Sequence, residues 1–289
     1  MNVLKCDLRS HVASLADELG ERNVLRPDAL RAAADYISTV WRGMGYAVVE
    51  QCYEVRGVSC TNLAVIRKGR KRPEQILVIG AHYDTVPGSP GADDNASGIA
   101  ALLEISRRFL TIETDLTVRF VAFVNEEAPF FSSGEMGSMF YARAARRRGD
   151  DIRLMMSLEM LGYYDDAPGS QRYPPLFRYF YPHRGNFIGF VSNLRSRRML
   201  HKTVRAFRAH SDFPAESVAT FAFIPGVALS DHLSFWRAGY RALMVTDTAF
   251  YRNPYYHTPL DTPDRIDYVS MARVTAGLSR AIAVLANMR

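Results

Sequence analysis

The sequence predicts an α/β fold, a three-layer sandwich in which helices flank a central mixed sheet of mostly parallel strands. Short apolar runs alternate with longer amphipathic segments from one end of the chain to the other, which is typical of parallel strands joined by helices. A chain of 289 residues is long enough to bury a full core. We predict a single domain over 1–289, because the candidate site residues extend from position 82 to position 257 and a boundary between them would divide the site.

The spacing of the apolar residues predicts the individual elements. Apolar residues recur at helical spacing over residues 9–20, 27–43, 96–110, 134–148, 195–210, 231–238 and from 264 to the end. Shorter alternating or continuous apolar runs predict strands over residues 46–54, 58–67, 75–80, 117–124, 152–158, 187–191, 218–224 and 241–246. The run at 75–80 is apolar throughout, as expected for a strand that is covered on both faces.

Turn and cap residues predict several of the boundaries. Pro27 is expected to open the second helix, and Gly57 to form the turn of a hairpin between the first two strands. Ser230 or Asp231 is expected to cap the short sixth helix. The segment 262–264, Thr-Pro-Asp, is expected to cap the last helix.

Residues 162–186 are rich in aromatic residues and prolines and show no periodicity, so we predict a long surface loop. Its aromatic rings could wall an apolar pocket for a substrate side chain, or could pack the loop onto the sheet. Alternatively, Arg172, Arg178 or Arg184 could bind a substrate carboxylate.

Composition excludes several classes of protein. The net charge is +6, but the arginine clusters fall on predicted helices without interleaved aromatic residues, so we expect no nucleic-acid partner. No window approaches 18 uninterrupted apolar residues, so we predict no membrane-spanning helix. The N-terminal segment lacks the apolar core of a signal peptide, and three cysteines suit a reducing compartment. We therefore expect the cytoplasm; the sequence does not predict an oligomeric state.

The loop 80–98 carries the densest group of metal-binding residue types. Its sequence, GAHYDTVPGSPGADDNASG, follows an apolar run and precedes an amphipathic helix, and open α/β sheets bind ligands at such loops. We interpret His82 and Asp94 as ligands of a divalent metal ion, with zinc favoured. Asp84, two residues after His82, is placed to accept the other ring N–H of that histidine.

Polar clusters follow other predicted strands as well. Glu126 and Glu127 follow one, Glu159 follows another, and His257 comes after a third. Such residues converge when their strands are neighbours in a parallel sheet. Two imidazoles with three carboxylates suit zinc, manganese, cobalt or iron better than calcium. They exceed the three protein ligands of one catalytic zinc, and a bridging Asp94 would allow them to hold two ions.

The adjacent pair Glu126 and Glu127 offers both a metal ligand and a base. A carboxylate beside an activated water can take its proton as the water attacks a carbonyl. We assign Glu126 as the base and Glu127 as the ligand, although adjacency alone leaves the order open. Such a pair is also common in solvated loops, and Asp231-His232 is better explained as a helix start than as a ligand pair.

Six short motifs occur in a characteristic order: AHYD at 81–84, GADDNASG at 91–98, NEE at 125–127, LEMLG at 158–162, SDH at 230–232, and YH at 256–257 followed by DT at 261–262. In this order they resemble the co-catalytic di-zinc exopeptidases. That family includes the bacterial leucyl aminopeptidases, glutamate carboxypeptidase II and, as a divergent branch, the glutaminyl cyclases. The resemblance covers roughly residues 58 to 270.

The resemblance implies a role for each matching residue. Asp94 would bridge two metal ions, zinc or alternatively cobalt or manganese, with His82 and Glu159 completing one site and Glu127 and His257 the other. The residues implied in catalysis are Glu126 as general base, Asp84 orienting His82, and Tyr256 stabilising the tetrahedral intermediate. Many relatives carry Asp at the position of Glu159, so the longer side chain is a departure that affects the metal spacing or the occupancy of the site that Glu159 shares with His82.

The resemblance therefore implies an enzyme, a zinc-dependent metallo-exopeptidase that hydrolyses peptide substrates. We expect an aminopeptidase, in which a metal-bound hydroxide attacks the scissile carbonyl after Glu126 takes the proton. A glutaminyl cyclase-like acyltransferase or a carboxypeptidase or dipeptidase on the same fold is the alternative. A binding protein that kept the fold is a third possibility, which the complete set of ligands and base disfavours.

Overall fold

The computed structural model describes residues 1–288. Its α-helices are α1 (Asn2–Ala13), α2 (Pro27–Gly43), α3 (Gly98–Arg108), α4 (Gly137–Arg148), α5 (Arg197–His210), α6 (His232–Arg237) and α7 (Tyr268–Ala286). Its strands are β1 (Val49–Val55), β2 (Val58–Arg67), β3 (Arg72–His82), β4 (Leu116–Phe123), β5 (Asp151–Glu159), β6 (Ile188–Asn193), β7 (Ala215–Thr220) and β8 (Ala242–Thr246).

The strands form one eight-stranded sheet in the order β1-β2-β4-β3-β5-β8-β6-β7 within the described residues. The central strands β4, β3, β5 and β8 run parallel to one another. β1 and β2 are antiparallel additions on one side. On the other side, β6 and β7 are parallel to each other and antiparallel to β8. The predicted mixed, mostly parallel sheet is therefore confirmed.

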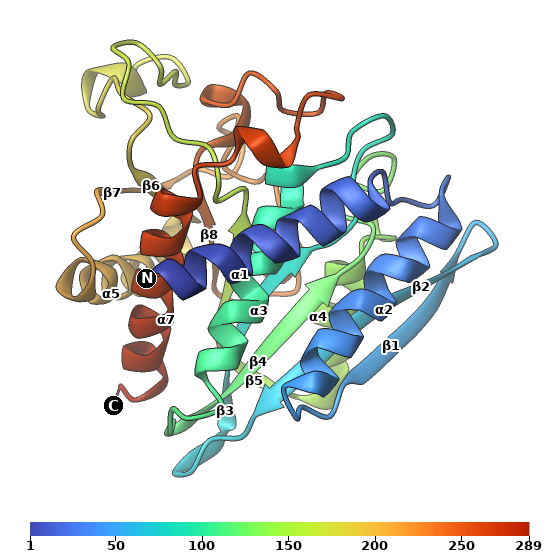
Figure 1. Ribbon diagram of the computed structural model, residues 1–289. Coiled ribbons are helices and arrows are strands. Elements are labelled where there is room, and N and C mark those ends of the chain that lie inside the picture. Colours follow the sequence, from blue (N-terminus) through green and yellow to red (C-terminus); the bar gives the residue numbers. More distant parts are fainter. Residues whose placement is uncertain (289) are drawn as a thin grey trace.

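Helices cover both faces of this sheet, as the α/β prediction requires. Figure 1 shows α1, α2, α3 and α7 on the near face and α4 behind the strands. On the near side, α3 packs against β3, β4 and β5, and α5 packs against β6 and β7. On the far side, α4 packs against α6 and β2, and α6 against β5 and β8.

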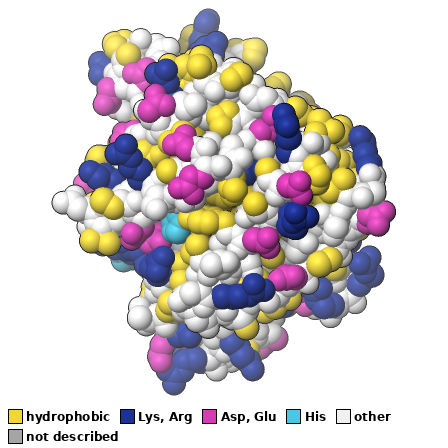
Figure 2. Space-filling model, turned by 45° about the vertical axis from the view of Figure 1, so that its right-hand side comes forward, with side chains coloured by type: hydrophobic (Ala, Val, Ile, Leu, Met, Phe, Trp, Pro, Cys, Tyr) yellow, Lys and Arg dark blue, Asp and Glu magenta, His cyan; other side chains and the backbone are white. Residues whose placement is uncertain are grey.

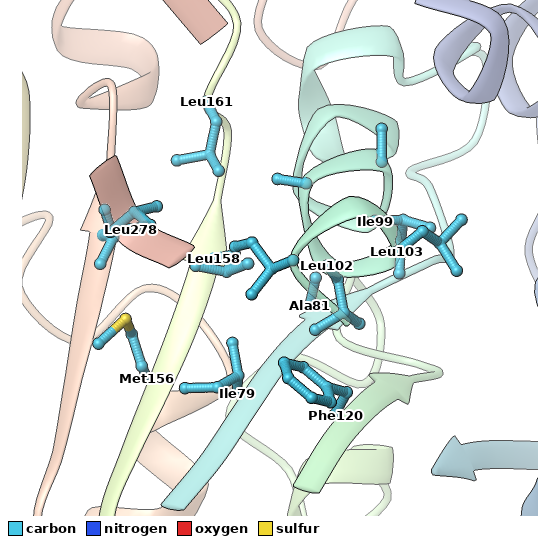
Figure 3. Close-up of a cluster of buried hydrophobic side chains, with 14 of the residues drawn as sticks. Ile79, Ala81, Ile99, Leu102, Leu103, Phe120, Met156, Leu158, Leu161 and Leu278 are labelled. Carbon is cyan, nitrogen blue, oxygen red and sulfur yellow. The ribbon is translucent and has the colours of Figure 1, made fainter. Parts of the chain in front are cut away.

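Alternate residues of β3 belong to two different hydrophobic clusters. Ile79 and Ala81 lie in the cluster under α3, whereas Ile76 and Val78 lie in the cluster under α4 and α6. Successive side chains of a strand point to opposite faces, so a strand covered on both faces must be apolar at every position. Figure 3 shows the first cluster, in which Leu102 of α3 lies among side chains of the central strands. This packing fixes the strand ends from which the site residues emerge.

The first helix begins earlier than predicted. The sequence suggested a helix over 9–20, but α1 begins at Asn2 and buries Leu4, Leu8 and Val12. These residues recur every four positions, which is the helical spacing that the prediction overlooked. A π-helical turn over Ser14–Leu19 follows and ends at Gly20, which has a φ of 69°.

Two other sequence predictions are wrong in their boundaries. The strand predicted over 218–224 is β7, Ala215–Thr220, and the aromatic residues after it are exposed on a turn: Phe221 is 57% and Phe223 79% exposed. An apolar run therefore continues past the end of the strand. The last helix is capped by Asp267, which accepts N–H groups of Val269 and Ser270, and not by the segment 262–264.

Residues 162–186 form the predicted loop, interrupted by one 3₁₀ turn at Phe177–Tyr179. Among the described helices, α7 alone is long and apolar enough to span a membrane, and 67% of the qualifying window is buried in the fold. It packs against α5, α1 and α3, as a core helix does. Figure 2 shows basic and acidic side chains interspersed over the face in view.

Candidate metal centre

Three adjacent parallel strands place their last residues at one edge of the sheet. His82 is the last residue of β3 and Glu159 the last residue of β5. Glu126 and Glu127 follow β4, which ends at Phe123. Because the order of these strands is β4-β3-β5, the side chains converge as their common edge predicts.

Asp94 lies at the centre of the converging side chains. Its Oδ1 lies 3.4 Å from His82 Nε2, and its Oδ2 lies 3.1 Å from His257 Nε2. On one side, Glu159 Oε2 lies 3.5 Å from His82 Nε2. On the other side, Glu127 Oε2 lies 3.4 Å from His257 Nε2. The five predicted ligand residues thus form two histidine–carboxylate pairs with Asp94 between them.

Glu126 lies beside this arrangement, with its Oε2 4.0 Å from His82 Nε2. Its side chain is buried, as are those of Glu127 and Glu159. His257 is the most open member, with a side chain that is 34% exposed. The cluster is therefore reached from the side of His257.

The loop that carries Asp94 is held by a carboxylate from a distant part of the chain. Asp261 accepts the N–H of Asp93 through Oδ1 (2.9 Å) and the N–H of Asp94 through Oδ2 (3.0 Å). Gly91 begins this loop with a φ of 58°, and a Cβ there would lie 2.2 Å from the Asp94 carbonyl oxygen. The tight turn therefore requires glycine, because any side chain would displace the backbone of Asp94.

Asn95 links the same loop to the end of β5. Its Nδ2 donates to the Leu158 carbonyl (2.9 Å), and its Oδ1 accepts from the N–H of Met160 (3.0 Å). These two bonds lie on either side of Glu159 in the sequence. The position of Asp94 is thereby coupled to that of Glu159.

Asp84 makes a clamp similar to that of Asp261. Its Oδ1 accepts the N–H of Glu126 and its Oδ2 accepts the N–H of Glu127, both at 3.1 Å. The His82 Nδ1 atom lies 3.2 Å from the Asp84 backbone carbonyl and 3.6 Å from its Oδ1. The ring N–H that we expected the carboxylate to accept is thus closer to the backbone oxygen. The carboxylate instead fixes the two glutamates.

Sequence reasoning missed the role of two serines beside Glu159. The Ser230 hydroxyl donates to Glu159 Oε2 at 2.6 Å, and the hydroxyls of Ser230 and Ser157 lie 2.7 Å apart. Ser230 belongs to the quoted motif at 230–232, which was the available signal. Asp231 occupies the N-cap position of α6, as predicted, but its side chain forms no cap hydrogen bond there.

The next two residues, Asp231 and His232, are buried, and burial shifts their pKa values in opposite directions. The two Asp231 carboxylate oxygens have no hydrogen-bond partner among residues 1–288, and burial, the largest cause, raises the pKa of Asp231 to about 7. His232 donates from Nε2 to the Val227 carbonyl at 2.8 Å, and burial lowers its pKa to about 4. His232 is therefore engaged in a structural hydrogen bond.

The cluster has more carboxylates than positive charges. Burial and the Asp94 carboxylate raise the pKa of Glu127 to about 8, and burial raises the pKa of Glu126 and Glu159 as well. Burial alone would lower the pKa of His257, but hydrogen bonds to Asp94 and Glu127 raise it to about 10. A cation at this position would relieve the excess of negative charge.

The donor atoms fit a divalent cation. His82, Asp94 and Glu127 each offer one ligand atom, and these atoms all lie within 4.8 Å of one another. His82 Nε2, Asp94 Oδ1 and Glu127 Oε1 are buried without a hydrogen-bond partner in residues 1–288. Buried polar atoms are normally paired, so unpaired atoms that face one another are what a metal site requires. Imidazole and carboxylate donors suit zinc.

The sequence that carries these residues matches a peptidase family. The peptidase family M28 matches residues 62–282, a range that contains every candidate residue from His82 to His257. The chain belongs to peptidase family M28. Membership of this family makes the chain a relative of metallopeptidases and implies peptide substrates.

Relatives of this M28 chain include an Escherichia coli K12 protein named as the uncharacterized protein YfbL. The two are 39% identical over 280 residues, which is 94% of this chain and 85% of YfbL. Leucine aminopeptidase 1 of Leptosphaeria maculans is 28% identical over 235 residues, or 73% of this chain. The M28 chain spans 53% of that enzyme, so about half of the aminopeptidase has a counterpart here.

Solved structures share the fold of the M28 chain. The Bacillus subtilis zinc aminopeptidase BSAP superposes with a TM-score of 0.76 and 15% identity, over 99% of this chain and 95% of BSAP. The Fimbriiglobus ruber glutaminyl cyclase superposes with a TM-score of 0.73 and 21% identity, over 97% and 95%. At these identities, the similarity establishes the aminopeptidase-like α/β fold, which two different activities use.

Tyr256 joins the metal cluster to a cavity next to it. Its ring stacks on His257 with centroids 3.7 Å apart, and it lines the cavity together with Glu159. Tyr173, Phe177 and Tyr181 of the loop 162–186 form part of the cavity wall. The three arginines that we considered as carboxylate binders do not line this cavity in the described part of the chain.

Proposed function

We propose that the chain is a zinc-dependent aminopeptidase that removes N-terminal residues from peptides. One observation carries this proposal: two histidine–carboxylate pairs flank Asp94, and buried unpaired atoms of the cluster face one another. Membership of family M28 supports peptide-bond hydrolysis, and leucine aminopeptidases among the relatives support the N-terminal specificity.

Five residues would hold two ions. Asp94 would be shared by both ions, with His82 and Glu159 holding one and Glu127 and His257 the other. When bound, zinc supplies Lewis acidity that polarises the scissile carbonyl and acidifies a water molecule. Ser230 would orient Glu159 through the hydroxyl that it donates to Oε2.

Glu126 would be the proton carrier of the reaction. Its carboxylate would accept a proton from the attacking water and pass it to the leaving amine, as a general base and then a general acid. Asp84 would position it through the clamp on the backbone N–H groups of Glu126 and Glu127. Tyr256, stacked on His257, would donate from its hydroxyl to the oxygen that becomes negative in the transition state.

The wall of the cavity favours an aminopeptidase over a carboxypeptidase. Apolar and aromatic residues dominate the lining, and the lining contains no arginine or lysine among residues 1–288 that would bind a substrate carboxylate.

The test combines metal analysis with a substrate panel. Purified protein should contain about two zinc ions per chain and should cleave free-amine aminoacyl anilides but not their N-acetylated forms. Glu126→Gln should lower kcat by about 10²- to 10⁴-fold with unchanged zinc content. Glu74→Gln, an exposed glutamate, is the matched control. Full activity of the Glu126 variant would refute its assignment as the base.

The glutaminyl cyclase with the same fold makes cyclisation the second activity to measure. N-terminal glutaminyl peptides are therefore included in the panel. Cyclisation without hydrolysis, together with about one zinc per chain, would replace the aminopeptidase proposal. A protein that binds no zinc and acts on no substrate would contradict both enzymes.

A further inference from the structure

The cavity beside the metal cluster has a volume of about 110 Å³. Its walls come from β6, β7 and β8, the loop 162–186 and the turn after β7. Glu159 and Tyr256 belong to both the cavity and the surroundings of the metal cluster. The cavity is therefore continuous with the place where the proposed reaction occurs.

A single row of residues crosses the sheet from the metal cluster to the far end of the cavity. Glu159 of β5 pairs with Thr246 of β8, Thr246 pairs with Gly189 of β6, and Gly189 pairs with Glu216 of β7. All four line the cavity. Three strand spacings separate Glu159 from Glu216, about 14 Å between their Cα atoms.

Gly189 leaves space in the middle of this row, because glycine has no side chain. A Cβ at that position would lie 3.1 Å from the Thr246 carbonyl oxygen and 3.5 Å from Thr248 Cγ2. A larger residue would fill the space between Thr246 and Glu216. The row therefore leads from the metal cluster to Glu216, and its third residue, Gly189, has no side chain that would block the way.

Glu216 is a partly exposed carboxylate. Burial raises its pKa and the Arg208 guanidinium lowers it. Among residues 1–288, however, Glu216 forms neither a direct ion pair nor a side-chain hydrogen bond, and Arg208 donates to the Ala215 carbonyl. Burial and the Glu216 carboxylate both raise the pKa of Tyr181. Burial also raises the pKa of Tyr173, which the Arg252 guanidinium lowers and the Glu216 carboxylate raises. The acidic group thus faces the aromatic wall of the cavity.

We propose that this cavity receives the side chain of the substrate's N-terminal residue, and that Glu216 makes lysine and arginine the preferred residues there. The inference rests on the proposed aminopeptidase activity. A long side chain is needed to pass Thr246 and Gly189 before it meets Glu216. Its methylene groups would pack on the apolar walls, while the cationic head would pair with the carboxylate and lie against tyrosine rings.

An uncharged side chain in the same cavity would leave the carboxylate unpaired. A side chain that covers Glu216 without pairing with it would remove water from the carboxylate, which is unfavourable, so norleucine, which is lysine without the terminal ammonium group, should be a poorer substrate. The two residues differ only in the group that would meet Glu216. Their comparison isolates the effect of that contact.

The experiment measures kcat/KM of the zinc-loaded enzyme for lysyl, arginyl, norleucyl and alanyl anilides. The wild type should prefer lysyl over norleucyl substrates by about 10- to 100-fold, the range of a hydrogen bond to a charged group. Glu216→Gln should abolish most of this preference by lowering kcat/KM for the basic substrates, while the alanyl substrate is unaffected. Glu54→Gln, an exposed glutamate on the opposite edge strand β1, should change nothing.

A charge reversal and a binding measurement complete the test. Glu216→Lys should shift the preference towards glutamyl substrates, and Gly189→Ala should weaken long substrates more than the alanyl one. Inhibition constants for lysine amide and norleucine amide should follow the same order as kcat/KM. Norleucyl substrates cleaved as well as lysyl ones, with no effect of Glu216→Gln, would overturn the inference while leaving the aminopeptidase proposal intact. Absence of cleavage of every free-amine substrate would reject both.

Discussion

The edge of the sheet that carries the site has two halves, which are stabilised by different kinds of interaction. Around β4, β3 and β5, buried charged groups are fixed by backbone hydrogen bonds, as in the clamps from Asp84 and Asp261. Around β8, β6 and β7, apolar side chains and the loop 162–186 enclose a cavity that the Glu216 carboxylate also lines. The first half is suited to holding reacting atoms in place, and the second to selecting a side chain.

Two buried arginines illustrate the same contrast. Arg22 is fully buried near the metal cluster and donates to carbonyl oxygens of Leu15, Gly20, Tyr83, Pro90 and Gly91. Arg252, near the cavity, donates to Gln171 and to the Tyr163 carbonyl, while its Nη2 has no partner in residues 1–288. It lies instead over the rings of Phe187 and Tyr164.

The difference between these arginines indicates how tightly each half is specified. Burial lowers the pKa of Arg22 to about 10, although carboxylates including Asp84 oppose the shift. The carbonyl groups that accept its hydrogen bonds fix the arrangement of the loops around the metal cluster. The region near Arg252 relies more on aromatic contacts, which tolerate adjustment. Substitutions in the two halves should therefore have unequal effects.

The largest effect is expected at the centre of the cluster. Asp94→Asn removes one charge and one oxygen from the proposed bridge between the two histidines. We expect zinc content to fall and kcat/KM to drop on the order of 10³-fold or more, since a metal ion contributes several kcal/mol to the reaction. Asp28→Asn, a highly exposed position, is the control, and retention of both zinc and activity would contradict the bridge.

The paired arginines give the next largest effect. Arg22→Met leaves several buried carbonyl groups without donors, and we expect a loss of roughly 3 kcal/mol or more in unfolding free energy. Arg252→Met should lose only about 1–2 kcal/mol, since fewer hydrogen bonds and a cation–π contact are removed. Urea unfolding of both variants gives the comparison directly. Equal losses would show that the two halves are equally constrained.

The clamp on the Asp94 loop should have a moderate effect. Asp261→Asn replaces one of two accepting oxygens with an amide that cannot accept the N–H of Asp93 or Asp94. Because such outer partners orient metal ligands, zinc affinity should fall about 10- to 100-fold in a chelator competition assay. Asp264→Asn, exposed in the same segment, should keep wild-type affinity. If both variants bind zinc equally well, the clamp does not orient Asp94.

The smallest effect concerns pH. The pKa of His232 is lowered to about 4 by burial, so its contribution to stability is complete above its ordinary value of 6.5 and is lost as pH falls towards 4. Between pH 6 and pH 4.5, the wild type should lose about 1 kcal/mol per pH unit more than His232→Gln. Urea unfolding at several pH values measures this difference. Parallel curves for the two proteins would exclude His232 as the titrating group.

Most of the fold could be predicted from periodicity and turn residues. Helix α2 begins at Pro27 and ends at Gly43 as predicted, because proline and glycine act locally. The end of β7 was predicted at the wrong residue for the opposite reason, because local residues do not determine it. Phe221 and Phe223 look like core residues in the sequence, but their rings stack on each other and stay exposed. Whether an apolar residue is buried depends on which other parts of the chain pack against it.

The metal cluster was also visible in the sequence, because His82, Glu126, Glu127 and Glu159 stand at or just after the ends of apolar runs that form strands. The roles of Ser230 and Asp261 were not, since a serine hydroxyl and a loop carboxylate have no periodicity that marks them. Their partners, Glu159 and the backbone of Asp94, lie 71 and 167 positions away. Hydrogen bonds over such separations follow from the strand order and not from local sequence.

The sequence by itself determined the α/β fold, the inventory of metal-binding residues and the aromatic character of the loop 162–186. These properties depend on residue type and short spacing, which are local. The tertiary structure decided that Asp84 clamps the two glutamates and that Glu216 faces the cavity. The row from Glu159 to Glu216 exists only because β8, β6 and β7 pair in that order, and pairing between distant strands is set by the packing of the whole chain.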